Sequence, residues 1–118
     1  MAIKEFTEKQ RRQDKEPEVR ISKKGAFNIN RSCNERFLKD ARFVVFLFDD
    51  DTDTIYLRPA SEDVSHAYKL RELNGQMQVS GTAFLTHFGI QFGDAVRRFS
   101  PEWDHKLKAL ALHEKKEQ

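Results

Sequence analysis

The chain is 118 residues long, which is enough for one hydrophobic core and too short for two independent ones. Its 21 Lys and Arg residues stand against 19 Asp and Glu, and the formal net charge of +2 excludes a strong overall field for a polyanionic partner. Any nucleic-acid-binding surface must therefore be local. The single cysteine, Cys33, cannot form a disulfide within the chain, which argues against a secreted disulfide scaffold and favours a cytoplasmic location.

The longest apolar run covers residues 43–48, far fewer than the roughly 20 residues that a membrane span requires, and the N-terminus lacks the apolar core of a signal peptide. We therefore expect no membrane association. Residues 1–18 mix charges of both signs with few apolar side chains, which predicts a flexible charged arm. A single globular domain is expected over 19–113, followed by a frayed tail over 114–118.

Alternation of apolar and polar residues begins at Val19 and predicts two strands joined by a tight turn at Gly25. Ser32, followed three residues later by Glu35, fits a capping box. We therefore predict a short helix whose buried face carries Cys33.

The run at 43–48 is unbroken, so we predict a strand covered on both faces at the centre of the core. A strand over 54–58 follows, and Pro59, which has no N–H to donate, is expected to end it. In the second half, Asn74-Gly75 between alternating segments predicts a two-residue hairpin turn, because both positions must take positive φ.

Thr82 or Ser80 is expected to cap a second short helix, and Gly89 followed by the apolar Ile90 fits a Schellman stop. Two more strands are predicted beyond this helix, near 95–100 and 107–112. The segment 106–113 fits a helix equally well.

The two halves of the chain match each other when one is shifted by about fifty residues. The glycine turns superimpose, and the apolar positions that follow them do so as well. The matched pairs include Gly25 with Gly75 and, after a small insertion, Val44 with Val96 and Ile55 with Leu107.

Pseudo-repeats are therefore predicted at 19–60 and 66–112. The predicted fold class is α+β, in which two tandem β-β-α-β-β units form one compact, mostly antiparallel β barrel-like domain with two short helices.

The first half, VRISKKGAFNINRSCNERFL followed by FVVFLFDDDTDTIYLRPA, resembles the AbrB/MazE-like swapped-hairpin family of small DNA-binding regulators and antitoxins. The likeness covers mainly residues 19–60: the SKKG opening, the short helix and the two strands after it. In that family two such units, normally from two chains, interleave into one small barrel. The resemblance implies an intramolecular version of that dimer and a role in transcription regulation. The whole chain also resembles small bacterial proteins, a likeness that implies no mechanism.

An acidic segment follows the central strand. Asp49, Asp51 and Asp53 have the spacing of the first ligands of a calcium loop. Thr54 and Ala60 stand where such a loop requires glycine and glutamate. We therefore predict a hydrated hairpin end and no metal site.

The remaining reactive side chains form no known catalytic pattern. His66, His87, His105 and His113 have no metal-binding spacing, and the chain contains no nucleophile elbow and no phosphate-cradling glycine loop. We predict that the protein is not an enzyme and has no catalytic residues, no cofactor and no small-molecule substrate.

Basic side chains are dense in the first half and recur in the second. A solvated strand face is one explanation, because 34% of all residues are charged. The favoured interpretation is a non-enzymatic, nucleic-acid-associated regulator that binds duplex DNA. The alternative is a structural or protein–protein interaction module that acts as a homo-oligomer or adaptor. The predicted nucleic-acid-binding residues are Arg20, Lys23, Lys24, Arg31, Arg97 and Arg98.

Overall fold

The structure is a computed structural model, which describes residues 16–38, 41–62 and 64–115. Most of the predicted arm, residues 1–15, and residues 116–118 of the predicted tail lie outside the described residues.

Nine strands and two short helices make up the described part of the chain. The first half contains β1 (Val19–Ile21), β2 (Ala26–Ile29), α1 (Arg31–Phe37), β3 (Phe43–Asp49) and β4 (Thr54–Ala60). The second half contains β5 (Tyr68–Lys69), β6 (Arg71–Leu73), β7 (Gln76–Ser80), α2 (Thr82–His87), β8 (Arg97–Asp104) and β9 (Ala109–Glu114).

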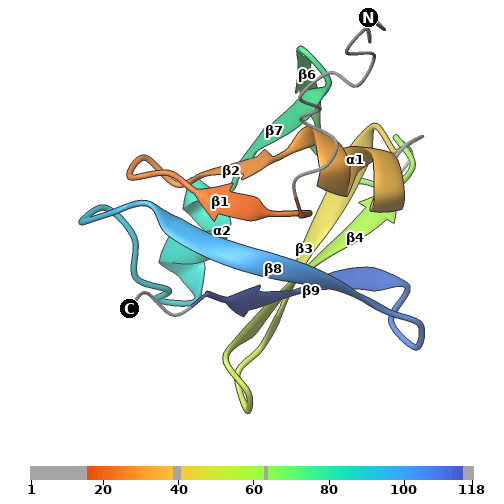
Figure 1. Cartoon of the computed structure of the whole chain (residues 1–118). Coiled ribbons are helices and arrows are strands. Elements are labelled where there is room, and N and C mark those ends of the chain that lie inside the picture. The colour runs from red at the N-terminus through yellow and green to blue at the C-terminus, as the bar shows by residue number, and fades with distance from the viewer. Residues whose placement is uncertain (1–15, 39–40, 63, 116–118) are drawn as a thin grey trace, which may run out of the picture.

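All strand pairs are antiparallel, and the sheet order is β5-β3-β4-β9-β8-β1-β2-β7-β6 (Figure 1). The two ends of this order belong to one segment of chain, residues 68–73. Its first part, β5, pairs with β3, and its second part, β6, pairs with β7. Between them, the backbone N–H of Leu70 donates to the carbonyl of Arg42 at 2.8 Å. The sheet is therefore nearly closed, which confirms the predicted compact, antiparallel, barrel-like domain with two short helices.

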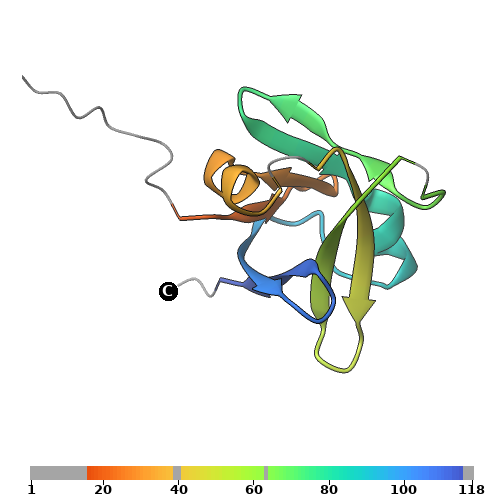
Figure 2. The ribbon, with the colours of Figure 1, turned by 90° about the vertical axis from the view of Figure 1, so that its right-hand side faces the viewer.

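The core lies inside the sheet and is made by alternate residues of its strands. Phe27 is fully buried, and its ring centroid lies 5.0 Å from that of Phe46 and 6.5 Å from that of Phe84 on α2. Each such side chain contributes roughly 1.5–3 kcal/mol when it is removed from water. The two helices lie on opposite sides of the molecule (Figure 2). Each helix adds buried side chains to this core, for example Cys33 from α1.

Two turn predictions are confirmed. Asn74 and Gly75 have φ values of 54° and 84° and connect β6 to β7 as a two-residue hairpin. Gly89 ends α2 with φ of 65°, and the N–H of Ile90 donates to the carbonyl of Leu85 at 2.9 Å, as in a Schellman motif.

The predicted cap of α1 is wrong. The helix begins at Arg31, and its cap is Asn30, whose Oδ1 accepts from the N–H of Cys33 at 2.9 Å. Ser32 lies inside the helix and is buried. Asn30 is the cap in place of Ser32 because its side-chain oxygen also accepts from the N–H of Glu18 at 3.1 Å. This second bond connects the residue before β1 to the start of the helix.

The predicted cap of α2 is also wrong. Gly81 occupies the cap position, and no side chain bonds the first turn there. The hydroxyl of Thr82 instead donates to the carbonyl of Lys24 at 2.8 Å, so this side chain joins α2 to the β1–β2 turn. Ser80 is the last residue of β7.

Strand β4 runs through Pro59 to Ala60, so the prediction that Pro59 ends the strand is wrong. Strand β9 pairs with β4 only over residues 55–57. Beyond that point the edge of β4 has no second neighbour that requires an N–H, and proline is tolerated.

Residues just outside the predicted domain, 19–113, form hydrogen bonds with it. Glu114 is the last residue of β9, and the N–H of Lys115 still donates to the carbonyl of Arg98 at 2.9 Å. At the other end, the amide of Asn30 donates to the carbonyl of Glu16 at 3.0 Å. The segment over 106–113, which the sequence left open, contributes a strand.

The two longest hairpins, β3–β4 and β8–β9, have matching loops. The carboxylates of Asp49 and Asp104 each accept from the backbone N–H two positions later, both at 2.9 Å. Asp53 and Lys108, near the ends of these loops, have φ values of 54° and 53°. In each of these two comparisons the corresponding residues are 55 positions apart.

The predicted correspondence of Val44 with Val96 and of Ile55 with Leu107 is wrong. Val44 and Ile55 are buried in strands, whereas Val96 and Leu107 are 44% and 37% exposed and lie outside strands. At a separation of 55, the position of Val44 corresponds to Phe99, which is buried. The cause is the connection after α2, residues 88–96, which is longer than the connection after α1, residues 38–42.

Candidate nucleic-acid interface

Five side chains line up across the outer face of the sheet. Residues that pair in register on neighbouring strands point to the same face, and the alternate residues Ile21 and Phe27 are fully buried. With strands about 4.8 Å apart, the row spans about 19 Å. We call it the outer row. In order across β6, β7, β2, β1 and β8, it consists of Arg71, Gln78, Asn28, Arg20 and Arg98.

The second and third side chains of the outer row, Gln78 and Asn28, are a pair of half-buried amides. Nε2 of Gln78 donates to Oδ1 of Asn28 at 2.9 Å. This bond fixes the orientation of both side chains. Within the described residues, the amide N–H groups of Asn28 and the amide oxygen of Gln78 form no other hydrogen bond, so they are available to outside partners.

The flanking cations differ in their pairing. Arg71 and Arg98 are exposed and form no ion pair with a carboxylate in the described part of the chain. Nε of Arg20, a side chain that is 50% exposed, donates to Glu18 at 2.6 Å. The other carboxylate oxygen of Glu18 accepts from Nζ of Lys115 at 2.8 Å.

Glu18 is therefore the carboxylate that partly neutralises this face. Its partial burial opposes ionisation, but the hydrogen bonds from Lys115 and Arg20 outweigh that effect and hold the pKa of the carboxyl below its usual value of 4.5. The group is ionised at neutral pH and cancels part of the positive charge of the face, and the exposed Glu16 is a second carboxylate that lines the same hollow as Arg20.

A hollow of about 710 Å³ lies over β1 and β2, and Arg20 and Asn28 from the outer row line it. Three further amide side chains, those of Asn30, Asn74 and Gln76, line the same hollow. Amides offer both donors and acceptors, so the surface is suited to hydrogen-bonding groups such as base edges and phosphates.

The structure brings some predicted site residues together and separates others. Strands β1 and β8 lie side by side (Figure 1), and their register makes Arg20 and Arg98 direct cross-strand neighbours. Lys23 and Lys24 are exposed on the β1–β2 turn, beyond one end of β2. Arg31 lies beyond the other end, where its guanidinium donates to the carbonyl of Asn74 at 2.7 Å.

Arg97 lies on the other face of β8 from Arg98. Its guanidinium makes two bonds to Glu114, at 2.7 and 2.8 Å, and a third to the carbonyl of Gln91 at 2.7 Å. The group also lies 5.3 Å from the ring centroid of Phe99. Its donors are thus used within the protein.

Sequence analysis missed four residues of this surface: Arg71, Gln78, Asn28 and Lys115. Alternation within one strand shows which residues share a face, but it does not show which strands become neighbours. The pairing of β1 with β8 joins positions 20 and 98, and no local sequence pattern predicts such a long-range contact.

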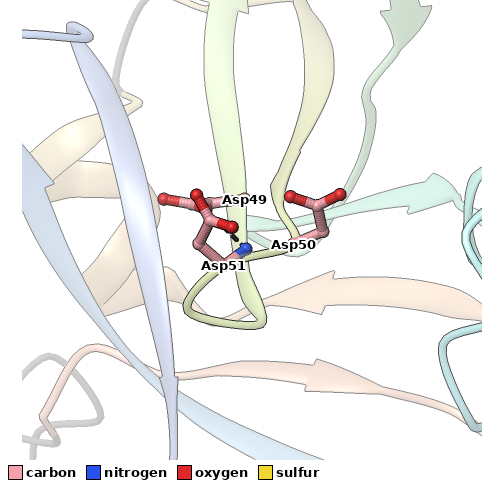
Figure 3. Close-up of side chains that lie close together, drawn as sticks. All are labelled: Asp49, Asp50 and Asp51. Carbon is pink, nitrogen blue, oxygen red and sulfur yellow. Dashed lines mark hydrogen bonds between the residues drawn. The ribbon is translucent and has the colours of Figure 1, made fainter.

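The acidic segment is the loop of the β3–β4 hairpin, as predicted. Carboxylate oxygens of Asp49, Asp50 and Asp51 lie within 4.8 Å of one another (Figure 3). The N–H of Asp51 donates to Asp49 at 2.9 Å, so Asp49 stabilises the turn.

Cys33 is fully buried on α1, as predicted. Burial raises the pKa of its thiol to about 12, against a smaller opposite effect of Arg36. The thiol is therefore neutral at physiological pH and poorly nucleophilic.

Comparisons with known proteins add no family to this description. The chain matches no family model, and comparisons with curated proteins and with solved structures gave no significant match. Within the described residues, neither helix has the length or apolar character needed to cross a membrane.

Proposed function

We propose that the protein is a non-enzymatic, nucleic-acid-binding regulator that binds duplex DNA through the outer row. The observation that carries the proposal is the alignment of three arginines and two amides on one outward face, with Arg71 and Arg98 outside any ion pair among the described residues. Arginine binds phosphates and guanine edges, and asparagine or glutamine binds adenine edges.

The dimensions of the row support this division of roles. The major groove of B-DNA is about 12 Å wide, whereas the row spans about 19 Å. The amides of Asn28 and Gln78, which arginines flank on both sides, therefore face the base edges, and Arg71 and Arg98 at the two ends of the row reach the phosphates. Lys23 and Lys24 contact the backbone farther along the duplex.

We propose further that the domain consists of two tandem β-β-α-β-β units related by an approximate two-fold axis, as the likeness to the AbrB/MazE-like family implies. The matching hairpin loops support this arrangement. So does the β4–β9 ladder, which is centred on Tyr56 opposite Ala111, residues that are themselves 55 positions apart.

The β2–β7 ladder supports the same axis. It places Asn28 opposite Gln78, and these residues differ by the 50 positions that superimpose the two glycine turns. The amide pair then lies on the axis, and Arg20 and Arg71 flank it at equivalent distances. A nearly palindromic DNA site fits such a surface best. The lone buried Cys33 supports the cytoplasmic location that we propose with this function.

The decisive experiment is a titration of fluorescent random duplex DNA, followed by anisotropy between about 50 and 200 mM salt. We expect binding that weakens steeply with salt. The double variant Arg71→Gln/Arg98→Gln should flatten the logarithmic salt slope by about 1.8, since each phosphate contact contributes about 0.9.

The matched control is Arg36→Gln/Lys106→Gln, which removes the same charge from exposed residues outside the row. An equal decrease of the salt slope in both double variants would show that DNA binds to the net charge of the protein and not to the outer row. Absence of binding at the lowest salt would refute the proposal. If the protein does not bind DNA and instead forms a homodimer whose stability does not change with salt, the result would support the alternative function, a structural or protein–protein interaction module.

A further inference from the structure

A second hollow, of about 780 Å³, is lined by the β3–β4 loop and by the connection between α2 and β8. Its inner wall is formed by core side chains: Ile55, Phe99 and Leu112 are each only 3% exposed, and all line it. Small-molecule sites typically enclose roughly 300–1,000 Å³ and are mostly apolar. This cleft has that size, and its inner wall is apolar, whereas charged side chains make up much of the rest of its lining.

The connection that forms one side of the cleft is longer than the connection that follows the first helix. Residues 38–42 join α1 to β3, whereas residues 88–96 join α2 to β8. The longer segment turns at Gly89 and Gly93, which have φ values of 65° and 111°, and it contributes Phe92 to the cleft. The additional residues therefore build a wall that the first half of the molecule does not require.

Aromatic rings line the mouth of the cleft. Phe88 is 46% exposed although it is a large apolar side chain, and its ring centroid lies 5.2 Å from that of Phe48. Phe48 and Phe92 also line the cleft. The faces of such rings attract cations within about 6 Å of the centroid.

The charged groups around these rings are mainly acidic. Arg97 and Glu114 neutralise each other through their two hydrogen bonds. Asp50, Asp53 and Asp94 also line the cleft, and none of them forms an ion pair with a cation in the part of the chain that the structure describes. The cleft is therefore negative overall, unlike the outer row.

We propose that this cleft binds a small organic cation with an apolar body. The cationic group lies between the carboxylates of Asp50 and Asp94 and the phenylalanine rings, and the apolar body contacts Ile55 and Leu112. Nε2 of Gln91 donates to Asp94 at 3.1 Å, but this neutral amide leaves the negative charge in place. An anion would therefore be repelled by three carboxylates, and a neutral compound would gain nothing from their charge or from the ring faces. The inference does not depend on nucleic-acid binding.

The test uses three probes that share one phenyl ring: benzyltrimethylammonium, benzyl alcohol and benzenesulfonate. Each is titrated into the full chain at low salt, and methyl chemical shifts of Ile55, Ile90 and Leu112 are followed by NMR. We expect saturable shifts of these methyls with the ammonium probe. Benzyl alcohol should bind about tenfold more weakly, and the sulfonate should not saturate.

Variants separate the charge of the cleft from the charge of the surface. Asp50→Asn/Asp94→Asn should weaken binding of the ammonium probe about tenfold and bring it close to that of benzyl alcohol. Glu16→Gln/Glu62→Gln removes two exposed carboxylates that do not line the cleft and should leave binding unchanged. All four substitutions are of exposed loop residues, so folding should be preserved.

Three results would overturn the proposal. The first is equal binding of the ammonium and the alcohol, which would show an apolar cleft without preference for charge. The second is an equal loss of affinity for the ammonium probe in the two double variants. The third is the absence of saturation with the ammonium probe while the methyl signals are resolved.

Discussion

Gly81 allows a severe test of the core packing, because its backbone accepts any residue while its surroundings do not. Its φ is −119°, so alanine adopts the conformation without strain. The added Cβ would lie 2.2 and 2.5 Å from two ring atoms of Phe27, where ordinary contact begins at 3.4 Å. The ring cannot retreat, because Phe27 is fully buried against Phe46 and Phe84.

We expect Gly81→Ala to destabilise the protein by about 3 kcal/mol, at the upper end of the range for overpacked cores. Urea unfolding, followed by the fluorescence of Trp103, measures the change. With a denaturant slope of about 1.5 kcal/mol/M, the midpoint should fall by about 2 M. Gly89→Ala is a contrasting variant: its Cβ would meet nothing within 4 Å, and any loss there reports the positive φ alone.

A second substitution tests the assigned cause. Phe27→Leu removes the ring atoms that the new methyl group meets, so the double variant should be more stable than the sum of the two single losses by about 1–2 kcal/mol. Additive losses would contradict the assigned clash. A Gly81→Ala variant within about 0.5 kcal/mol of the parent would refute the packing argument altogether.

Four further predictions follow from contacts described above. Asn30→Ala should lower stability by about 1–2 kcal/mol in thermal unfolding, because one oxygen caps α1 and also holds Glu18. Glu18→Gln should tighten binding to duplex DNA at low salt, since it releases two cations; weaker binding in the anisotropy titration would contradict the role of the outer row. The pKa values of Glu18 and Glu114 lie below 4.5 in the folded protein, so the stabilisation that these carboxylates provide is present above about pH 4.5 and is lost as the pH falls through the folded pKa values. The melting temperature should therefore drop in this acidic range, and it should drop less in Glu18→Gln/Glu114→Gln. Cys33 should react with a disulfide reagent only as fast as the native state opens, and urea should accelerate the reaction.

The features that sequence predicted well are those fixed by a few adjacent residues. Asn74-Gly75 specifies its turn because both residues must take positive φ, whatever surrounds them. The cap of α1 was missed because two residues, Asn30 and Ser32, are both good caps. The choice between them depends on Glu18, which directly precedes β1 and meets the start of the helix only in the folded protein.

The basic surface was predicted only in part, for two physical reasons. Adjacent residues of a strand point to opposite faces, so Arg97 and Arg98 cannot share one surface once both belong to β8. That conclusion was available from the sequence. The sequence could not show that Arg20, Arg98 and Arg71 lie in one row, because their alignment depends on the register of strands that are far apart in the chain.

The pairing of β1 with β8 fixes the order in which the chain can complete its fold during translation. Val19 leaves the ribosome 80 residues before Phe99, its partner in the sheet. Until β8 emerges, β1 lacks one neighbouring strand, and Val19 and Ile21, which are fully buried in the finished protein, lack their final cover. The nascent first half therefore exposes apolar surface that is covered only when β8 has been synthesised.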